Sequence, residues 1–263
     1  MKLCCILFRI NLNLTIMPVQ FSSFIGVETC ADRSRPFTFA VIDSERVIRS
    51  LGSGELQDVF AFLAGQEDAL VAINAPKPRR NKAAAPTEGR ISRTRTGEME
   101  LVKRGVNFEH TPGTLKRCPR WMRLGFRLYE ELEKIGYEAY PHASAQLQLF
   151  ESRGEASFWN LLGHEPLKKD SLEGSLQRQL VLAMCGLPVP DAMGFFEEIT
   201  RHRILHNRLP LEDIYSSAEL NTLAAAYCAW LAGTHPGQLE SVGQAGEGLI
   251  YLPGQTVVTS PRE

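Results

Sequence analysis

Three apolar segments decide the fold class of this chain: FIGVETC (Phe24–Cys30), FTFAVID (Phe37–Asp43) and ALVAIN (Ala69–Asn74). The first is a short apolar run that ends in a polar turn. The second alternates loosely and is followed after two residues by RVIRS (46–50), so the pair predicts a hairpin. The third is apolar throughout and ends before Ala75–Pro76, which is typical of a strand buried on both faces of a parallel sheet.

The segments beyond this region predict helices around the sheet. Residues 55–64 have apolar side chains at helical spacing, and residues 121–135 form an amphipathic pattern that stops at Gly136. The other predicted elements are a short strand at 137–140, helices at 172–185, 192–205 and 218–232, and a strand at 248–252. This order predicts an α/β fold, with a mixed sheet flanked by helices and a helical C-terminal half.

Length and composition exclude several classes of protein. With 263 residues, 44% of them hydrophobic, the chain can form one large domain or two small ones around a sizeable core. Its 29 Lys and Arg balance 30 Asp and Glu, which excludes a wholly basic nucleic-acid coat and an acidic disordered tail. No apolar run approaches the roughly 20 residues that span a bilayer, so no membrane partner is expected.

The cysteines and the first residues bear on the compartment. The six cysteines show no CxxC spacing, which argues against a zinc knuckle or a redox dithiol and favours reduced thiols in a cytoplasmic protein. The first sixteen residues resemble a signal peptide, but Arg9 interrupts the apolar stretch and Met17 offers a natural start. We expect residues 1–20 to be a disordered or mis-started tail, residues 21–253 to be one domain with an insertion at about 77–118, and residues 254–263 to be a second tail.

Positive charge is concentrated in one stretch. Between Lys77 and Arg127 the chain has fourteen Lys and Arg against four Glu, so the remainder is acidic overall. Arginine suits phosphate geometry, so this stretch predicts a nucleic-acid surface for DNA or RNA, and a solvated loop is the alternative. The candidate phosphate-binding residues are Arg79, Arg80, Arg90, Arg93, Arg95, Arg117, Arg120 and Arg123, together with His142, whose alternative role is to cap a helix that follows it.

Polar residues stand where the predicted strands end. Glu28 and Asn74 close two strands, Glu138 lies in the short strand at 137–140, and Asn221 lies near the start of an apolar helix. Because the carboxyl ends of neighbouring parallel strands converge, these side chains are expected to meet. Clustered oxygen ligands suit Mg²⁺ or Mn²⁺, and two such ions about 4 Å apart clamp a scissile phosphate. A turn-forming role is the alternative for each residue taken alone.

Short segments then occur in a familiar order: FIGVETC, FTFAVID, ALVAINAP, the basic stretch, WMRLGFRLYEELEKIGYEAYPHAS, HNRLPLEDIYSSAELNTLAAAYCAWLAG and GEGLIYLP. Together they resemble the domain-of-unknown-function family 429, a family of predicted RNase H-fold nucleases related to Holliday-junction resolvases. The resemblance covers about residues 21–253. It implies an RNase H-like sheet with acidic metal ligands and a metal-dependent hydrolysis of phosphodiesters.

The resemblance also implies which residues form the site. Its pattern has aspartate where this chain has Glu28, Asn74 and Asn221, whereas Glu138 keeps the pattern Glu-x-Tyr-Pro. Asparagine offers a carbonyl oxygen but no charge, so Glu28 and Glu138 are the expected ligands of Mg²⁺ or Mn²⁺, and Asn74 and Asn221 are neutral members of the catalytic set. We therefore expect a divalent-metal-dependent nuclease weakened by two amides. The alternative is a catalytically inactive member of the family that still binds nucleic acid.

Other motifs are weaker. His202 and His206 are four residues apart on a predicted helix, a spacing that suits zinc if a third ligand is present, although the surrounding arginines favour a solvated basic helix end. Glu212, Asp213 and Glu219 could partly replace the missing acids. A phosphotransferase of the wider superfamily is a third reading, which the lack of a duplicated domain disfavours. Neither GxxxxGK[ST] nor GxGxxG occurs, so a nucleotide-binding glycine loop is not supported.

Overall fold

The strands of the chain form one mixed sheet in a computed structural model that describes residues 19–30, 34–77, 95–107, 109–196, 204–206 and 211–255. The predictions for the two tails fall wholly or largely outside these residues, as do those for Arg79, Arg80, Arg90, Arg93 and His202. The strands are β1 (Ser23–Thr29), β2 (Phe37–Ile42), β3 (Ile48–Gly54), β4 (Ala69–Asn74), β5 (Glu138–Ala139), β6 (Leu147–Ser152), β7 (Leu239–Val242) and β8 (Ile250–Pro253).

The strand order is β3-β2-β1-β4-β6-β8-β7, with β5 paired to β6 beside this path. β1, β2 and β3 form an antiparallel meander, whereas β1, β4, β6 and β8 run parallel to one another. The continuous apolar run of β4 places it at the centre of the sheet, where both of its faces are buried. The predicted strand, hairpin and parallel central strand are therefore confirmed.

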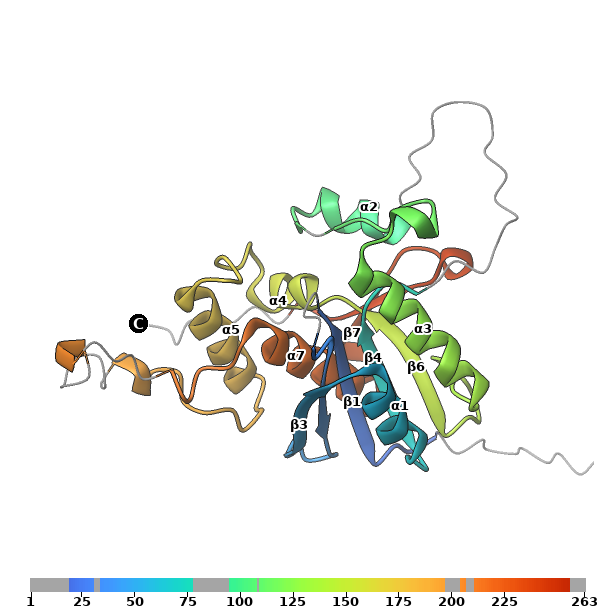
Figure 1. The fold of residues 1–263 in the computed structure, drawn as a ribbon, viewed down its shortest axis with the longest axis horizontal. Coiled ribbons are helices and arrows are strands. Elements are labelled where there is room, and N and C mark those ends of the chain that lie inside the picture. Colours follow the sequence, from blue (N-terminus) through green and yellow to red (C-terminus); the bar gives the residue numbers. More distant parts are fainter. Residues whose placement is uncertain are drawn as a thin grey trace, which may run out of the picture.

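Helices cover both faces of the sheet (Figure 1). The described α-helices are α1 (Leu56–Ala64), α2 (Thr96–Lys103), α3 (Arg120–Lys134), α4 (Gly154–Leu162), α5 (Leu172–Met184) and α7 (Ser217–Thr234). On one face, α1 and α3 pack over the buried side chains of Ile25, Val27 and Val71. On the other face, α7, α4 and α5 pack over Phe24 and Leu70, so each central strand contributes to two cores.

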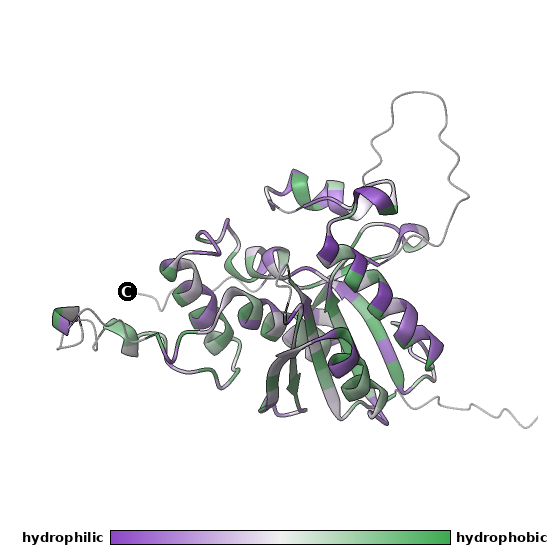
Figure 2. Ribbon diagram, in the orientation of Figure 1, coloured by the Kyte–Doolittle hydropathy of each residue, from purple (hydrophilic) through white to green (hydrophobic). Residues whose placement is uncertain are grey.

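Hydropathy follows these layers (Figure 2). The strands are mostly apolar, and the outward side of α3 is hydrophilic, as its amphipathic sequence predicts. Helix α7 differs because it is buried nearly all round, from Leu220 to Ala232. It begins at a capping box in which the Ser216 side chain accepts the backbone N–H of Glu219, and the Glu219 carboxylate accepts the N–H of Ser216.

Several elements were not predicted from the sequence. The structure adds β6, β7, α2 and α4. Of these, α2 lies within the expected insertion, so part of that insertion is a helix that packs on the sheet. Half of the helix expected at 192–205 lies outside the described residues, and His206 closes a short 3-10 turn at Ile204–His206. Within the described part of the chain, no helix combines the length and apolar character that crossing a membrane requires.

Candidate functional site

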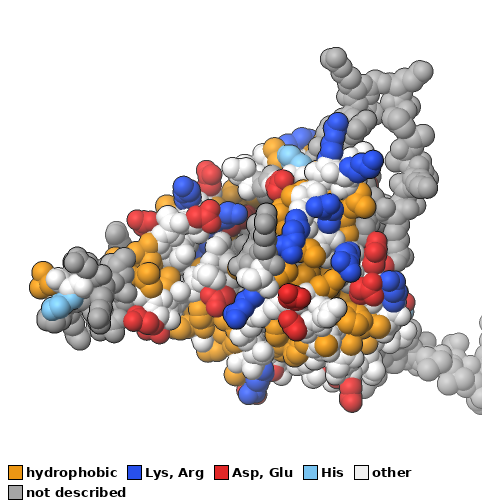
Figure 3. Space-filling model, viewed as in Figure 1, with side chains coloured by type: hydrophobic (Ala, Val, Ile, Leu, Met, Phe, Trp, Pro, Cys, Tyr) orange, Lys and Arg blue, Asp and Glu red, His pale blue; other side chains and the backbone are white. Residues whose placement is uncertain are grey.

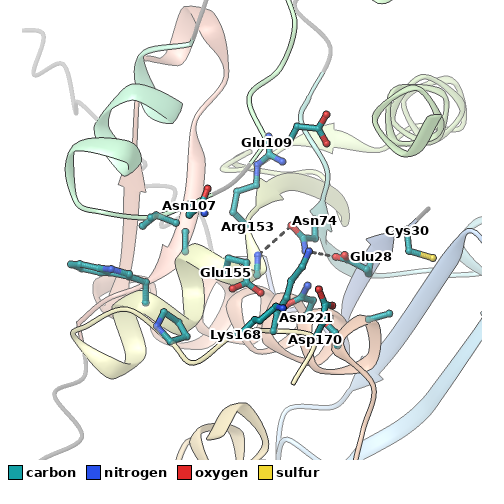
Figure 4. A pocket seen from close by; sticks show the side chains of 18 of the residues that line it. Glu28, Cys30, Asn74, Asn107, Glu109, Arg153, Glu155, Lys168, Asp170 and Asn221 are labelled. Atoms are coloured by element: carbon teal, nitrogen blue, oxygen red, sulfur yellow. Dashed lines mark hydrogen bonds between the residues drawn. The ribbon is translucent and has the colours of Figure 1, made fainter. Parts of the chain in front are cut away.

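Three of the predicted site residues meet at the carboxyl ends of the central strands (Figure 4). Glu28 of β1 and Asn74 of β4 are direct partners in the parallel register. The Asn74 Nδ2 group donates a hydrogen bond to the Glu28 carboxyl group, and the Asn221 side chain, from the second turn of α7, hydrogen-bonds the same carboxyl group. Parallel strand ends therefore bring together residues that are far apart in the sequence.

The start of α4 completes this arrangement. The Asn74 Oδ1 atom accepts the backbone N–H of Gly154 at 3.2 Å. Gly154 lies so close to Asn221 that a Cβ atom at this position would be 2.5 Å from the Asn221 Oδ1 atom. A glycine at the first position of α4 thus lets this helix, β4 and α7 approach the same point.

Burial changes the charge of the site. Burial raises the pKa of Glu28 from 4.5 to about 8, and hydrogen bonds from Asn74 and Asn221 oppose that rise only in part. Lys169 lowers and Glu155 raises the same pKa. With a pKa near 8, the Glu28 carboxyl group resists ionisation at neutral pH, which weakens the negative charge of the centre.

Glu138 does not join this group, which corrects the expectation from the sequence. It is exposed on β5 and pairs with Gln148, which pairs in turn with Leu70 near the start of β4. Glu138 thus lies near the amino ends of the parallel strands, about four residues of register from Glu28 and Asn74. The chain turns back after β5 and enters β6, and this unpredicted strand occupies the place beside β4 that β5 was expected to take.

The acid at the carboxyl end of β6 is Glu151, and it belongs to a buried ion-pair cluster. Its carboxylate accepts from Arg95 Nη1 at 2.8 Å and from Arg153 Nε at 3.1 Å. Glu98 of α2 lies within 3.8 Å of Arg95 and within 3.5 Å of Arg153. Arg95 is only 1% exposed, so this candidate phosphate-binding residue is instead a buried partner of two glutamates.

The exposed cations of the basic stretch gather beside the site. Arg120, Arg123 and Arg127 are exposed along the first half of α3, and Arg117 is exposed in the turn before it. Figure 3 shows Lys and Arg side chains collected over the face on which α3 lies. His142 lies elsewhere, at the amino end of β6, where its Nδ1 atom accepts the backbone N–H groups of Ser144 and Ala145. These contacts stabilise the turn before β6, but the helix that His142 was expected to cap is not formed, because the strand β6 follows.

An open pocket of about 740 Å³ surrounds Glu28, Asn74 and Asn221. Figure 4 shows further charged side chains around them that the sequence did not single out. The additional charged and aromatic lining residues are Glu109, Arg153, Glu155, Glu165, Lys168, Lys169, Asp170, Trp121 and Trp159. The alternation in LQLFES (147–152), followed by the glycine at 154, was the available signal for β6 and α4, and it would have placed Glu155 just after a strand end, in the first turn of a helix.

The donor set does not fit a two-metal centre. Within the described residues, no group of three or more His, Cys, Asp or Glu side chains is placed to hold a metal ion. The closest set has Glu28 with two amides whose N–H groups face its carboxyl oxygens, so those oxygens are already engaged. Mg²⁺ and Mn²⁺ need several free, charged oxygen ligands. We therefore derive no reaction step through a metal ion.

The site is thus a protonated carboxyl group, two amides and a pocket beside a basic helix face. The function of the site is therefore inferred from the chemistry of these side chains. No family model and no curated protein matches the sequence, and no solved structure matches the fold.

Proposed function

We propose that this chain is a nucleic-acid-binding protein of RNase H-like fold that has no metal-dependent hydrolysis of phosphodiesters. An antiparallel meander β3-β2-β1 followed by the parallel strands β4 and β6 is the arrangement that the resemblance implies, and it supports the proposal. The residues at the carboxyl ends of β1 and β4 are those that the resemblance assigns to the catalytic set.

One observation carries the catalytic half of the proposal. The Asn74 amide donates to Glu28, which is its register partner, where two aspartates would repel each other and call for a cation. Asn221 adds a second amide to the same carboxyl group. The two amides thus stabilise this centre through hydrogen bonds, whereas two aspartates would need a bound metal ion. Protonation of Glu28 removes the last negative charge of the three side chains.

The basic face supports the binding half. Arg120, Arg123 and Arg127 recur at helical spacing on the exposed side of α3. Trp121, in the same helix, lines the pocket, so a strand bound along these arginines passes the pocket mouth. Arginine side chains pair with phosphate oxygens through fixed forks of N–H donors.

Fluorescence anisotropy with labelled single-stranded and duplex oligonucleotides tests the binding half. The triple variant Arg120→Gln/Arg123→Gln/Arg127→Gln is expected to lose affinity by at least tenfold at about 0.1 M salt. The matched control Arg35→Gln/Arg49→Gln/Lys103→Gln removes three exposed cations outside α3 and is expected to bind as the wild type does. Equal affinities of the two triple variants would contradict a binding face on α3.

A weakened metal-dependent nuclease is the second candidate, and one observation favours it. Glu155 and Asp170 line the same pocket as Glu28, so two further carboxylates are within the cavity although the ion-binding geometry is not formed. The cleavage assay that ends the Discussion separates the two functions.

A further inference from the structure

Two buried oxygen atoms in the pocket have no hydrogen-bond donor. The Asn221 Oδ1 atom is unpartnered although the residue is only 6% exposed. The Glu155 Oε1 atom is also buried and unpartnered, whereas its Oε2 atom accepts from Arg178 Nη2 at 2.7 Å. Both residues line the same cavity. Buried acceptors are nearly always paired, so these two atoms indicate a missing donor rather than a missing anion.

The same cavity offers aromatic surface. Trp121 and Trp159 both line it and are half-buried. The Trp121 indole is held in place because its Nε1 atom donates to Glu109 at 3.1 Å. Tryptophan faces stack on nucleobases without regard to sequence, whereas acceptor atoms select among bases by their N–H groups.

We propose that this pocket receives one unpaired nucleobase that carries an exocyclic amino group (adenine, cytosine or guanine, but not thymine) from a single strand. The inference rests on the proposed function, because the strand's phosphates would lie along Arg120 and Arg123 of α3. An amino group has two N–H bonds to offer to the Asn221 and Glu155 oxygens. Thymine offers a single imide N–H flanked by two carbonyl oxygens, which would face these acceptors unfavourably.

Size and charge agree with this occupant. A cavity of about 740 Å³ is within the range of pockets that hold small organic ligands. Lys168 and Lys169 also line the cavity and would neutralise the phosphate of the inserted nucleotide. A duplex keeps its amino groups in base pairs, so insertion requires an unpaired or extruded base.

The test compares oligonucleotides that differ in one functional group. Labelled 12-residue single strands of dA, dC and dT are titrated by anisotropy, together with a strand in which unsubstituted purine replaces adenine. The dA and dC strands are expected to bind about tenfold tighter than the dT and purine strands, because only they supply the amino group. An ordered water satisfying the acceptors instead would give equal affinities for dA and for the purine strand, and would overturn the inference.

Two variants locate the preference in this pocket. Asn221→Leu removes one acceptor and is expected to abolish the preference for dA over the purine strand while phosphate binding persists. Asn107→Leu changes an exposed asparagine on the same pocket lining, away from the orphan oxygens, and is expected to keep the preference. A preference that survives Asn221→Leu in a folded protein would overturn the assignment. If Asn221→Leu fails to fold, the wild-type comparison of adenine with purine decides.

The outcomes also separate this inference from the proposed function. Equal binding of all four strands would leave a nucleic-acid-binding protein without a base pocket. Absence of binding to any strand or duplex would overturn both.

Discussion

The proton on Glu28 links the site to the stability of the fold. Because the pKa of Glu28 rises from 4.5 to about 8 on folding, the folded chain binds this proton more tightly than the unfolded chain. The contribution is fully present below about pH 4.5 and is lost as the pH rises toward 8. The free energy of unfolding is therefore expected to fall by on the order of 2 kcal/mol over this window, less than the full shift implies, since the pocket is open to solvent.

Urea unfolding at pH 5 and pH 8 measures this dependence. Glu28→Gln keeps the shape but cannot titrate, so its stability is expected to vary less with pH than that of the wild type. Glu138→Gln is the matched control, because Glu138 is exposed and away from the site, and it should retain the wild-type dependence. An unchanged pH dependence in Glu28→Gln would contradict the raised pKa.

Replacing the two amides by acids should create a cation site. In Asn74→Asp/Asn221→Asp, two carboxylates replace the amides that now contact Glu28. Their mutual repulsion is relieved by a divalent ion, so 5 mM Mn²⁺ is expected to raise the melting temperature of the double variant by roughly 3–5 °C and to leave that of the wild type unchanged. Calorimetric scans with and without Mn²⁺ check this, and an equal rise in the wild type would show that the amides already hold the ion.

The sequence predicted part of the site at this scale. The meeting of Glu28, Asn74 and Asn221 was accessible because strand ends can be read from apolar runs that stop at a polar residue. The exclusion of Glu138 was not accessible, because it depends on the unpredicted β6 lying beside β4. Nor was the burial of Arg95, which follows from its pairing with Glu151, and that residue lies 56 positions away.

At the scale of the elements, α7 packs very closely against β1. A Cβ atom on Gly26 would lie 2.0 Å from the backbone oxygen of Thr222 and 2.4 Å from the backbone nitrogen of Ala226. Gly26→Ala must therefore move the helix that carries Asn221, and is expected to destabilise the fold by about 3 kcal/mol or more. Gly237→Ala has open space around it and is expected to be neutral. Urea unfolding of both variants decides the point.

The buried ion-pair cluster links α2 to the sheet. Glu151→Ala leaves Arg95 and Arg153 buried without their shared carboxylate, and is expected to cost about 3–5 kcal/mol. Glu131→Ala breaks the exposed pair with Lys134 and is expected to cost less than about 0.5 kcal/mol. Similar losses from the two variants in urea unfolding would mean that the buried cluster does not stabilise the fold.

The elements were predictable to the extent that periodicity reveals them. The strands β1, β2 and β4 and the helix α3 follow clear apolar patterns, and all were found. The strand β6 and the helix α4 were missed because, in LQLFESRGEASFWNLL, a two-residue period passes into a helical one within a few residues.

At the scale of the molecule, the distribution of exposed charge predicts how binding depends on salt. The chain is nearly neutral, but its exposed arginines gather over α3 (Figure 3). Binding of a single strand is expected to weaken linearly in log salt. Removing Arg120, Arg123 and Arg127 should reduce the slope by about 2, because each lost phosphate contact contributes about 0.7. Titrations from 50 to 300 mM KCl check this slope, and an unchanged slope would place the contacts elsewhere.

The central claim is binding without metal-dependent cleavage, and one assay tests it most directly. Labelled DNA and RNA, single-stranded, duplex and branched, are incubated with the wild type and Mn²⁺, beside Glu28→Ala and Asn74→Asp/Asn221→Asp. The account predicts that the wild type retains nucleic acid and leaves it uncut. Mn²⁺-dependent cutting by the wild type that disappears in Glu28→Ala would contradict the account and establish a working nuclease with two amides in its centre.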